Sequence, residues 1–112
     1  MKRYASHFVL SPYKEWLKFC VLEVDNEAIR LFPLKEELPS VEWLPGVIVL
    51  FPRSQLQHSL NHYLKENSIA LNRDETIDDR LISLNDYSIY HLYPYDFTLM
   101  QPVAETRSIQ LL

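Results

Sequence analysis

The order of apolar and polar residues predicts β-strands along most of the chain. In residues 2–10, Tyr4, Phe8 and Leu10 share one side, and Ala5, His7 and Val9 share the other. Such alternation is typical of a strand, because successive side chains point to opposite faces. Further strand-like patterns lie at residues 16–24, 28–34, 41–43, 46–51, 81–84, 87–93, 97–100 and 108–112. Residues 46–51 are rich in β-branched side chains and apolar throughout, which predicts a strand covered on both faces.

The period changes after this apolar run and predicts one inserted helix over residues 54–66. Ser54 and Gln57 have the spacing of a capping box, in which two side chains satisfy backbone N–H groups at a helix start. An apolar stripe at helical spacing follows, which we expect to pack on a sheet. Its members are Leu56, Leu60, Tyr63 and Leu64.

Together these elements predict a mainly β fold in one domain, residues 1–112. The Asp25-Asn26 pair favours a tight hairpin turn, because both residue types tolerate positive φ. We expect about five to eight strands and the one helix, arranged as a small β-sandwich or a partly closed barrel. A chain of 112 residues is long enough for one hydrophobic core without disulfide or metal support.

Composition excludes several classes of function. The net charge is −4 and the eleven Lys and Arg residues are scattered, which argues against nucleic acid as a partner. The longest apolar run is far too short to span a membrane, and no segment has the basic amphipathic face of a membrane-surface helix. Gly46 is the only glycine, which rules out glycine-rich phosphate-binding loops. The single cysteine, Cys20, allows no intramolecular disulfide, and we expect a cytoplasmic protein with no cofactor.

Two histidines on the predicted helix are the candidate metal ligands. His58 and His62 are four residues apart, as in zincin helices, and Glu66 follows one turn later. Ser59 stands where a zincin has its general-base glutamate. On a helical wheel with Leu56 at zero, the histidines point to about 200° and 240°, away from the apolar stripe. We therefore expect two solvated histidines, with a metal site of His58, His62 and Glu66 as the alternative.

The other candidate groups have structural explanations. His7 and His91 fall in predicted strands, where packing and hydrogen bonds usually satisfy a histidine. An acidic cluster lacks the glycine and ligand alternation of a calcium loop and is expected to be a solvated loop. It consists of Asp74, Glu75, Asp78 and Asp79. No serine lies in a nucleophile elbow, and Cys20 lacks a recognisable protease context.

Four segments resemble strands of the small composite domain of the amidohydrolase (metallo-dependent hydrolase) superfamily. These are residues 4–10, 21–30, 42–49 and 87–97, in the order that the family has them. The resemblance implies a β-sandwich built from both ends of the chain around a catalytic (β/α)₈ barrel. It also implies a Pro-Gly pair followed closely by a His-x-His metal motif.

The sequence departs from this family where the chemistry should begin. If Pro45-Gly46 matches the family's pair, Phe51 and Arg53 stand where the two histidines belong. Residues 54–80 occupy the place of a barrel of about 250 residues. The resemblance therefore implies the sandwich and removes the metal-dependent activity.

We expect a non-catalytic interaction or accessory module that forms a homodimer or binds a protein partner. Tyr90, Tyr93 and Tyr95 are the candidate partner-binding residues, because strand 87–93 and the residues after it are rich in aromatic side chains. The alternative is a hydrolase-like or metal-binding protein whose site of His58, His62 and Glu66 is assembled by self-association. A small ligand held between the sheets is a third hypothesis.

Overall fold

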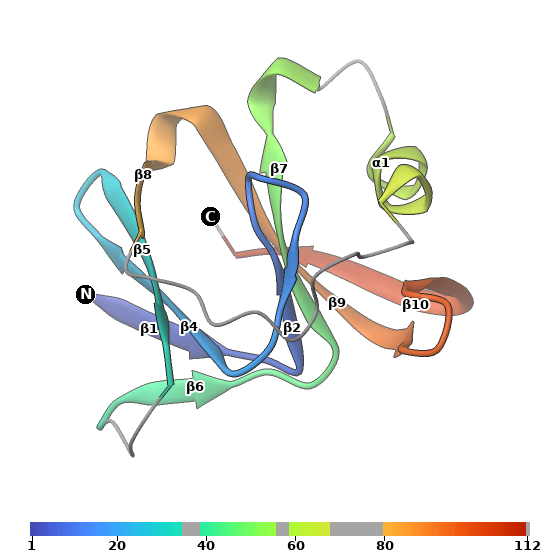
Figure 1. The fold of residues 1–112 in the computed structure, drawn as a ribbon, viewed down its shortest axis with the longest axis horizontal. Coiled ribbons are helices and arrows are strands. Elements are labelled where there is room, and N and C mark those ends of the chain that lie inside the picture. Colours follow the sequence, from blue (N-terminus) through green and yellow to red (C-terminus); the bar gives the residue numbers. More distant parts are fainter. Residues whose placement is uncertain (35–38, 56–58, 68–79, 112) are drawn as a thin grey trace.

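The computed structural model describes residues 1–34, 39–55, 59–67 and 80–111 (Figure 1). Ten strands, one α-helix and two short 3₁₀ helices lie in these ranges. The strands are β1 (Lys2–Ala5), β2 (Phe8–Leu10), β3 (Trp16–Leu17), β4 (Cys20–Asp25), β5 (Ala28–Pro33), β6 (Val41–Trp43), β7 (Val47–Pro52), β8 (Arg80–Ser83), β9 (Tyr87–Asp96) and β10 (Gln101–Gln110). The helix α1 spans Leu60–Glu66, and the 3₁₀ helices span Arg53–Gln55 and Leu84–Asp86. None of the described helices is long and apolar enough to cross a membrane.

The strands form two five-stranded sheets, which confirms the mainly β fold class. The first sheet has the order β6-β1-β4-β5-β8 and the second the order β10-β9-β7-β2-β3. In Figure 1 the first sheet lies at the left, β2 and β7 of the second sheet lie at the centre, and α1 lies at the right, above β9 and β10. Within the described part of the chain, neither sheet closes into a barrel. The hairpin of β4 and β5 forms at the expected place, with Asn26 at φ 55° in its turn.

Three segments pass from one sheet to the other, and two of these crossings raise the strand number above the five to eight expected. Residues 2–10 bend at Ser6 and His7, so β1 belongs to the first sheet and β2 to the second. Residues 16–25 do the same between β3 and β4, and residues 41–52 between β6 and β7. The first and third of these segments run side by side, with β1 parallel to β6 and β2 parallel to β7. The first two crossings each divide what the sequence predicts as one strand, residues 2–10 and 16–24, whereas residues 41–43 and 46–51 are predicted as two strands.

The apolar side chains form two clusters, one on each side of the second sheet. The cluster between the sheets includes Leu22 of β4 and Ile48 and Leu50 of β7. The other cluster contains Val49 of β7 and Leu64 of α1. Strand β7 is therefore covered on both faces, as its continuous apolar run predicts.

The helix starts later than the sequence predicts. Arg53–Gln55 is a 3₁₀ turn, and the α-helical N-cap is Ser59, whose Oγ accepts a hydrogen bond from the backbone N of His62 at 3.0 Å. Gln57 and Leu56 lie outside the described residues. Ser59 is itself a favourable N-cap residue, and a hydroxyl that accepts from the third helical N–H fixes the start of the helix there. The rest of the predicted stripe packs on the second sheet, with Tyr63 and Leu64 buried and Leu60 partly buried.

The end of the chain also differs from the expectation. Residues 97–100 form a turn and not a strand, because Asp96 Oδ1 accepts hydrogen bonds from the backbone N of Thr98 and of Leu99 at 2.8 and 3.0 Å. The last strand, β10, is longer than the predicted 108–112 and pairs with β9 as a hairpin.

Because the hydroxyl of Tyr63 is buried, we expect the protein to lose stability at alkaline pH. Its hydroxyl is buried with no hydrogen-bond partner among the described residues. Burial, helped by Tyr87 and Glu66, raises the pKa of Tyr63 to about 12. An unfolded tyrosine ionises near pH 10, so the unfolded state loses its proton at a lower pH than the folded state. The free energy of unfolding therefore decreases as pH rises from about 10 to about 12. Ionisation of Tyr63 lowers the free energy of unfolding by at most about 1.4 kcal/mol per pH unit.

Urea unfolding at several pH values with the Tyr63→Phe variant tests this. The variant keeps the ring, which lies 5.1 Å from that of Phe51, and removes only the ionisable hydroxyl. We expect it to change the free energy of unfolding at pH 7 by less than about 1 kcal/mol, because the hydroxyl lacks a described partner. We also expect a shallower decline above pH 10. An unchanged alkaline slope would contradict the role of Tyr63.

Candidate functional site

One surface of the first sheet collects charged side chains from three neighbouring strands. Tyr4, Leu22 and Leu31 pack in the core between the sheets. Side chains alternate along a strand, so the neighbouring residues of β1, β4 and β5 point to the opposite face. We call this the outer face of the first sheet.

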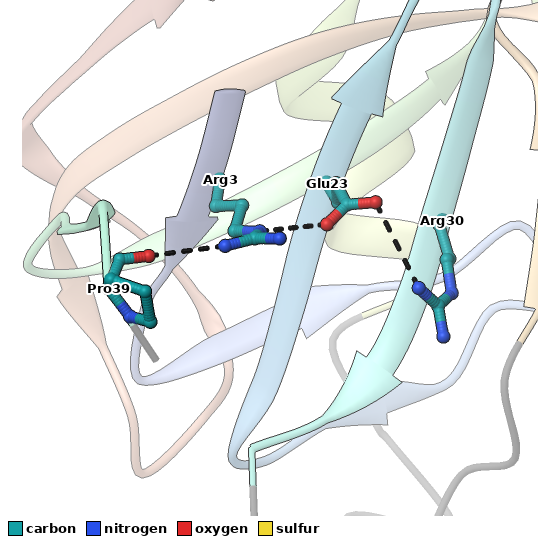
Figure 2. A network of polar contacts seen from close by, with 4 residues as sticks. All are labelled: Arg3, Glu23, Arg30 and Pro39. Atoms are coloured by element: carbon teal, nitrogen blue, oxygen red, sulfur yellow. Dashed lines mark hydrogen bonds and ion pairs between the residues drawn. The ribbon is translucent and has the colours of Figure 1, made fainter. Parts of the chain in front are cut away.

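The outer face holds a row of three ionic side chains, shown in Figure 2. Arg3 lies opposite Glu23, and Glu23 lies opposite Arg30. Arg3 Nε donates to Glu23 Oε2 at 2.8 Å, and Arg30 Nη1 lies 4.0 Å from Glu23 Oε1. Arg3 Nη1 also donates to the carbonyl oxygen of Pro39 at 3.2 Å, which ties the row to the loop before β6.

Glu23 is the only buried acidic side chain among the described residues. A buried carboxylate is strongly disfavoured unless it is paired and hydrogen-bonded, and the two guanidinium groups supply that pairing. The guanidinium of Arg30 lies 4.7 Å from the ring centre of Phe32, a cation–π distance. The charge of Glu23 is therefore compensated within an ionic network of three side chains.

A hollow of about 610 Å³ opens beside this row. Its lining combines charged, polar and apolar side chains of β4, β5 and β8: Glu23, Asp25, Asn26, Glu27, Ala28, Arg30, Leu81, Ile82 and Ser83. Leu81 lies opposite Arg30 and is 77% exposed, on β8, which is an edge strand of the sheet among the residues that the structure describes. An exposed apolar side chain on a strand edge favours contact with another chain. We call this hollow with Leu81 the β8 hollow.

The local sequence pattern does not predict the β8 hollow. The alternation in residues 2–10, 21–24 and 28–34 carries a signal for outward charges, since Arg3, Glu23 and Arg30 interrupt apolar positions. Leu81 carries no such signal, because an apolar residue in a short strand has the same pattern whether it points inward or outward.

His7, which lies in the bend between β1 and β2 and not in a strand, and His91 of β9 both contact the bend between β6 and β7. His7 Nδ1 accepts a hydrogen bond from the backbone N of Gly46 at 3.1 Å, and His91 Nε2 donates to the carbonyl oxygen of Pro45 at 2.5 Å. Ser6 Oγ lies 2.6 Å from the Leu44 oxygen and 2.7 Å from the Gly46 oxygen, both acceptors for its single hydrogen. Both histidines therefore contact the same bend, in agreement with the structural explanation.

The predicted metal ligands are only partly described. His62 Nε2 lies 2.9 Å from Glu66 Oε1, and both side chains are more than half exposed, as the wheel predicts for His62. His58 lies outside the described residues. Within the described ranges, no group of three or more His, Cys, Asp or Glu side chains could hold a metal ion. The metal-binding alternative stays a prediction that rests on the His62–Glu66 pair.

The three candidate tyrosines lie at different depths. Tyr95 is buried, 5.7 Å from the ring of Trp16, and burial raises the pKa of its hydroxyl. Tyr90 is partly buried against the cluster under α1. Tyr93 is exposed, so of the three only Tyr93 offers most of its surface to a partner.

The remaining sequence candidates add no site. Cys20 is buried and forms no disulfide. The acidic cluster Asp74, Glu75, Asp78 and Asp79 lies outside the described residues. No family model matches the sequence, and neither a curated protein nor a solved structure is measurably similar to the chain.

Proposed function

We propose that the chain is a non-catalytic β-sandwich module that binds another protein through the β8 hollow. The exposure of Leu81 supports this proposal most directly. A large apolar side chain on an edge strand offers the apolar group to a second chain, together with a strand edge that no described residue pairs with. The neighbouring charges of Asp25, Glu27 and Arg30 would surround this contact with polar groups, which is the usual composition of an interface rim.

The chemistry of the row argues for binding over catalysis. A general base needs a carboxylate whose oxygen can reach a substrate proton. The carboxylate oxygens of Glu23 are directed at Arg3 and Arg30. Arginine is enriched among residues that dominate binding energy at interfaces, and Arg30 lies beside Leu81.

The resemblance to the amidohydrolase composite domain suggests one kind of partner. In that family the small domain accompanies a barrel, and this chain has the small domain's fold class without a barrel. A hydrolase that lacks its own sandwich is therefore the partner class that the resemblance favours. A second copy of the chain is the other possibility that the sequence raised, and sedimentation of the purified protein distinguishes the two.

Substitution of Leu81 by arginine tests the proposed interface. We expect tagged wild-type protein to capture a stoichiometric partner from its native host, or to sediment as a dimer. We expect Leu81→Arg to weaken that association at least tenfold, about 1.4 kcal/mol, because the charge replaces the apolar contact. The free energy of unfolding should stay within about 0.5 kcal/mol of wild type, since the side chain is exposed.

The matched control is Leu99→Arg, which adds the same charge at another exposed leucine, in the turn between β9 and β10. It should leave the association unchanged. Equal association of all three proteins, or the absence of any stoichiometric partner and of a dimer, would overturn the proposal.

A further inference from the structure

A second concave site lies at the junction of the two sheets, away from the β8 hollow. It encloses about 230 Å³ and is lined by Ser6, His7, Phe8, Lys18, Phe19 and Trp43. These residues come from the bend between β1 and β2, from the residues just before β4, and from the end of β6. We call it the junction cleft. Four of its six lining side chains are aromatic, and polar groups come from Ser6, His7, Lys18 and the indole N–H of Trp43.

Packing in the hydrophobic core does not explain two of the aromatic residues that line the junction cleft. Phe19 is 73% exposed, and its φ of 51° is a left-handed conformation that bulky side chains rarely adopt. A glycine or an asparagine would satisfy this backbone with less strain. Trp43 is 54% exposed on the edge strand of the first sheet. Strain and exposure of large apolar groups at one place are features of binding sites.

The hydrogen-bond donors of the junction cleft come from His7, Lys18 and the indole of Trp43. Because His7 Nδ1 accepts from the backbone N–H of Gly46, the neutral ring carries its proton on Nε2. The ammonium of Lys18 lies 5.7 Å from the ring centre of Phe8 and has three donors. Ser6 directs its hydroxyl hydrogen at the carbonyl oxygens of Leu44 and Gly46. None of the described lining residues is acidic, so the donors of His7 and Lys18 suit a ligand with an acceptor group such as a carboxylate.

We propose that the junction cleft binds a small aromatic carboxylate. Its ring would lie against Phe19 and Trp43, at the separation of 4.5–7 Å that aromatic pairs prefer. Its carboxylate would accept hydrogen bonds from Lys18 and from His7 Nε2, and bonds to an ionised group are the stronger kind. The volume suits one ring, since pockets for larger ligands start at about 300 Å³. This site involves other residues than the β8 hollow and does not depend on the proposed protein partner.

The two tryptophans provide the test. Trp43 is exposed in the junction cleft, whereas Trp16 is fully buried with its Nε1 donating to the carbonyl oxygen of Asn67 at 2.8 Å. The full chain, labelled with ¹⁵N, should give two indole N–H resonances, and Trp43→Phe assigns the one from Trp43. Titration with phenylacetate should shift the Trp43 resonance saturably, with a dissociation constant below about 1 mM. The Trp16 resonance should stay in place and report the intact fold.

Matched ligands and variants separate the two parts of the site. Phenylacetamide, which keeps the ring and loses the charge, should bind at least about tenfold more weakly. The Phe19→Asn variant should bind phenylacetate at least about tenfold more weakly. The Lys18→Met variant should bind phenylacetate and phenylacetamide with equal affinity. The Leu81→Arg variant should bind phenylacetate as wild type does. A failure to find a protein partner at the β8 hollow would therefore leave this result unaffected. No saturable shift up to about 10 mM, equal binding of acid and amide, or undiminished binding by Phe19→Asn would overturn the proposal.

Discussion

Replacing Gly46 by alanine is expected to destabilise the protein by more than about 3 kcal/mol, beyond the effect of most single substitutions. A Cβ at this position would lie 2.1 Å from the carbonyl oxygen of Leu92, far inside van der Waals contact. That oxygen belongs to the backbone of β9, which pairs with β7 directly after the glycine, so it cannot move without disturbing the sheet. The φ of Gly46 is 97°, which side-chain-bearing residues rarely adopt.

The measurement is urea unfolding of the variant beside a neighbouring control. Pro45→Ala changes the adjacent residue, whose side chain is exposed, and leaves the carbonyl oxygen that His91 contacts. We expect it to change the free energy of unfolding by no more than about 1 kcal/mol. If Gly46→Ala also costs less than about 1 kcal/mol, the close approach of β7 and β9 is not as described.

Replacing Leu64 by alanine is expected to cost about 2–5 kcal/mol, the range for buried leucines. Leu64 is fully buried in the cluster between α1 and the second sheet. The helix has seven residues, too few to be stable in water by itself. The stability of the helix therefore depends on this contact, and the helix in turn shields the apolar side chains of β7 that face it from solvent.

Two neighbouring variants complete the test. Lys65→Ala removes an exposed side chain of the same helix and should change the free energy of unfolding by less than about 0.5 kcal/mol. Leu60→Ala, at a partly buried position of the same stripe, should lie between the two. A loss below about 1 kcal/mol for Leu64→Ala would mean that α1 is not part of the core.

The candidate sites could not be predicted from the sequence, although most strands could. Alternation assigns a side chain to one face of its own strand, so the outward direction of Arg3, Glu23 and Arg30 was implicit. Their contact depends on the pairing of β1 with β4 and of β4 with β5. The hairpin pairing is local and follows from its turn, whereas the β1–β4 register is set by packing between distant residues.

The bends between strands show more clearly that local sequence does not predict contacts between distant residues. The pattern of residues 2–10 places Tyr4 and Phe8 on one side, yet they belong to different clusters, because the chain turns at Ser6 and His7 between them. The hydrogen bonds that hold this junction join residues about forty positions apart in the chain, such as Ser6 with Gly46. No window of local sequence contains both partners.

The sequence by itself determined the mainly β class, the hairpin at Asp25-Asn26, the doubly covered strand after Gly46 and an apolar helix face. These features follow from local periodicity and turn chemistry, which act over a few residues. Only the tertiary structure decided which strands pair, where long strands cross between sheets, and that Leu81, Phe19 and Trp43 are exposed. Burial is a property of the assembled layers, so an apolar residue in a short strand acquires its role, in the core or at a surface, only when those layers have formed.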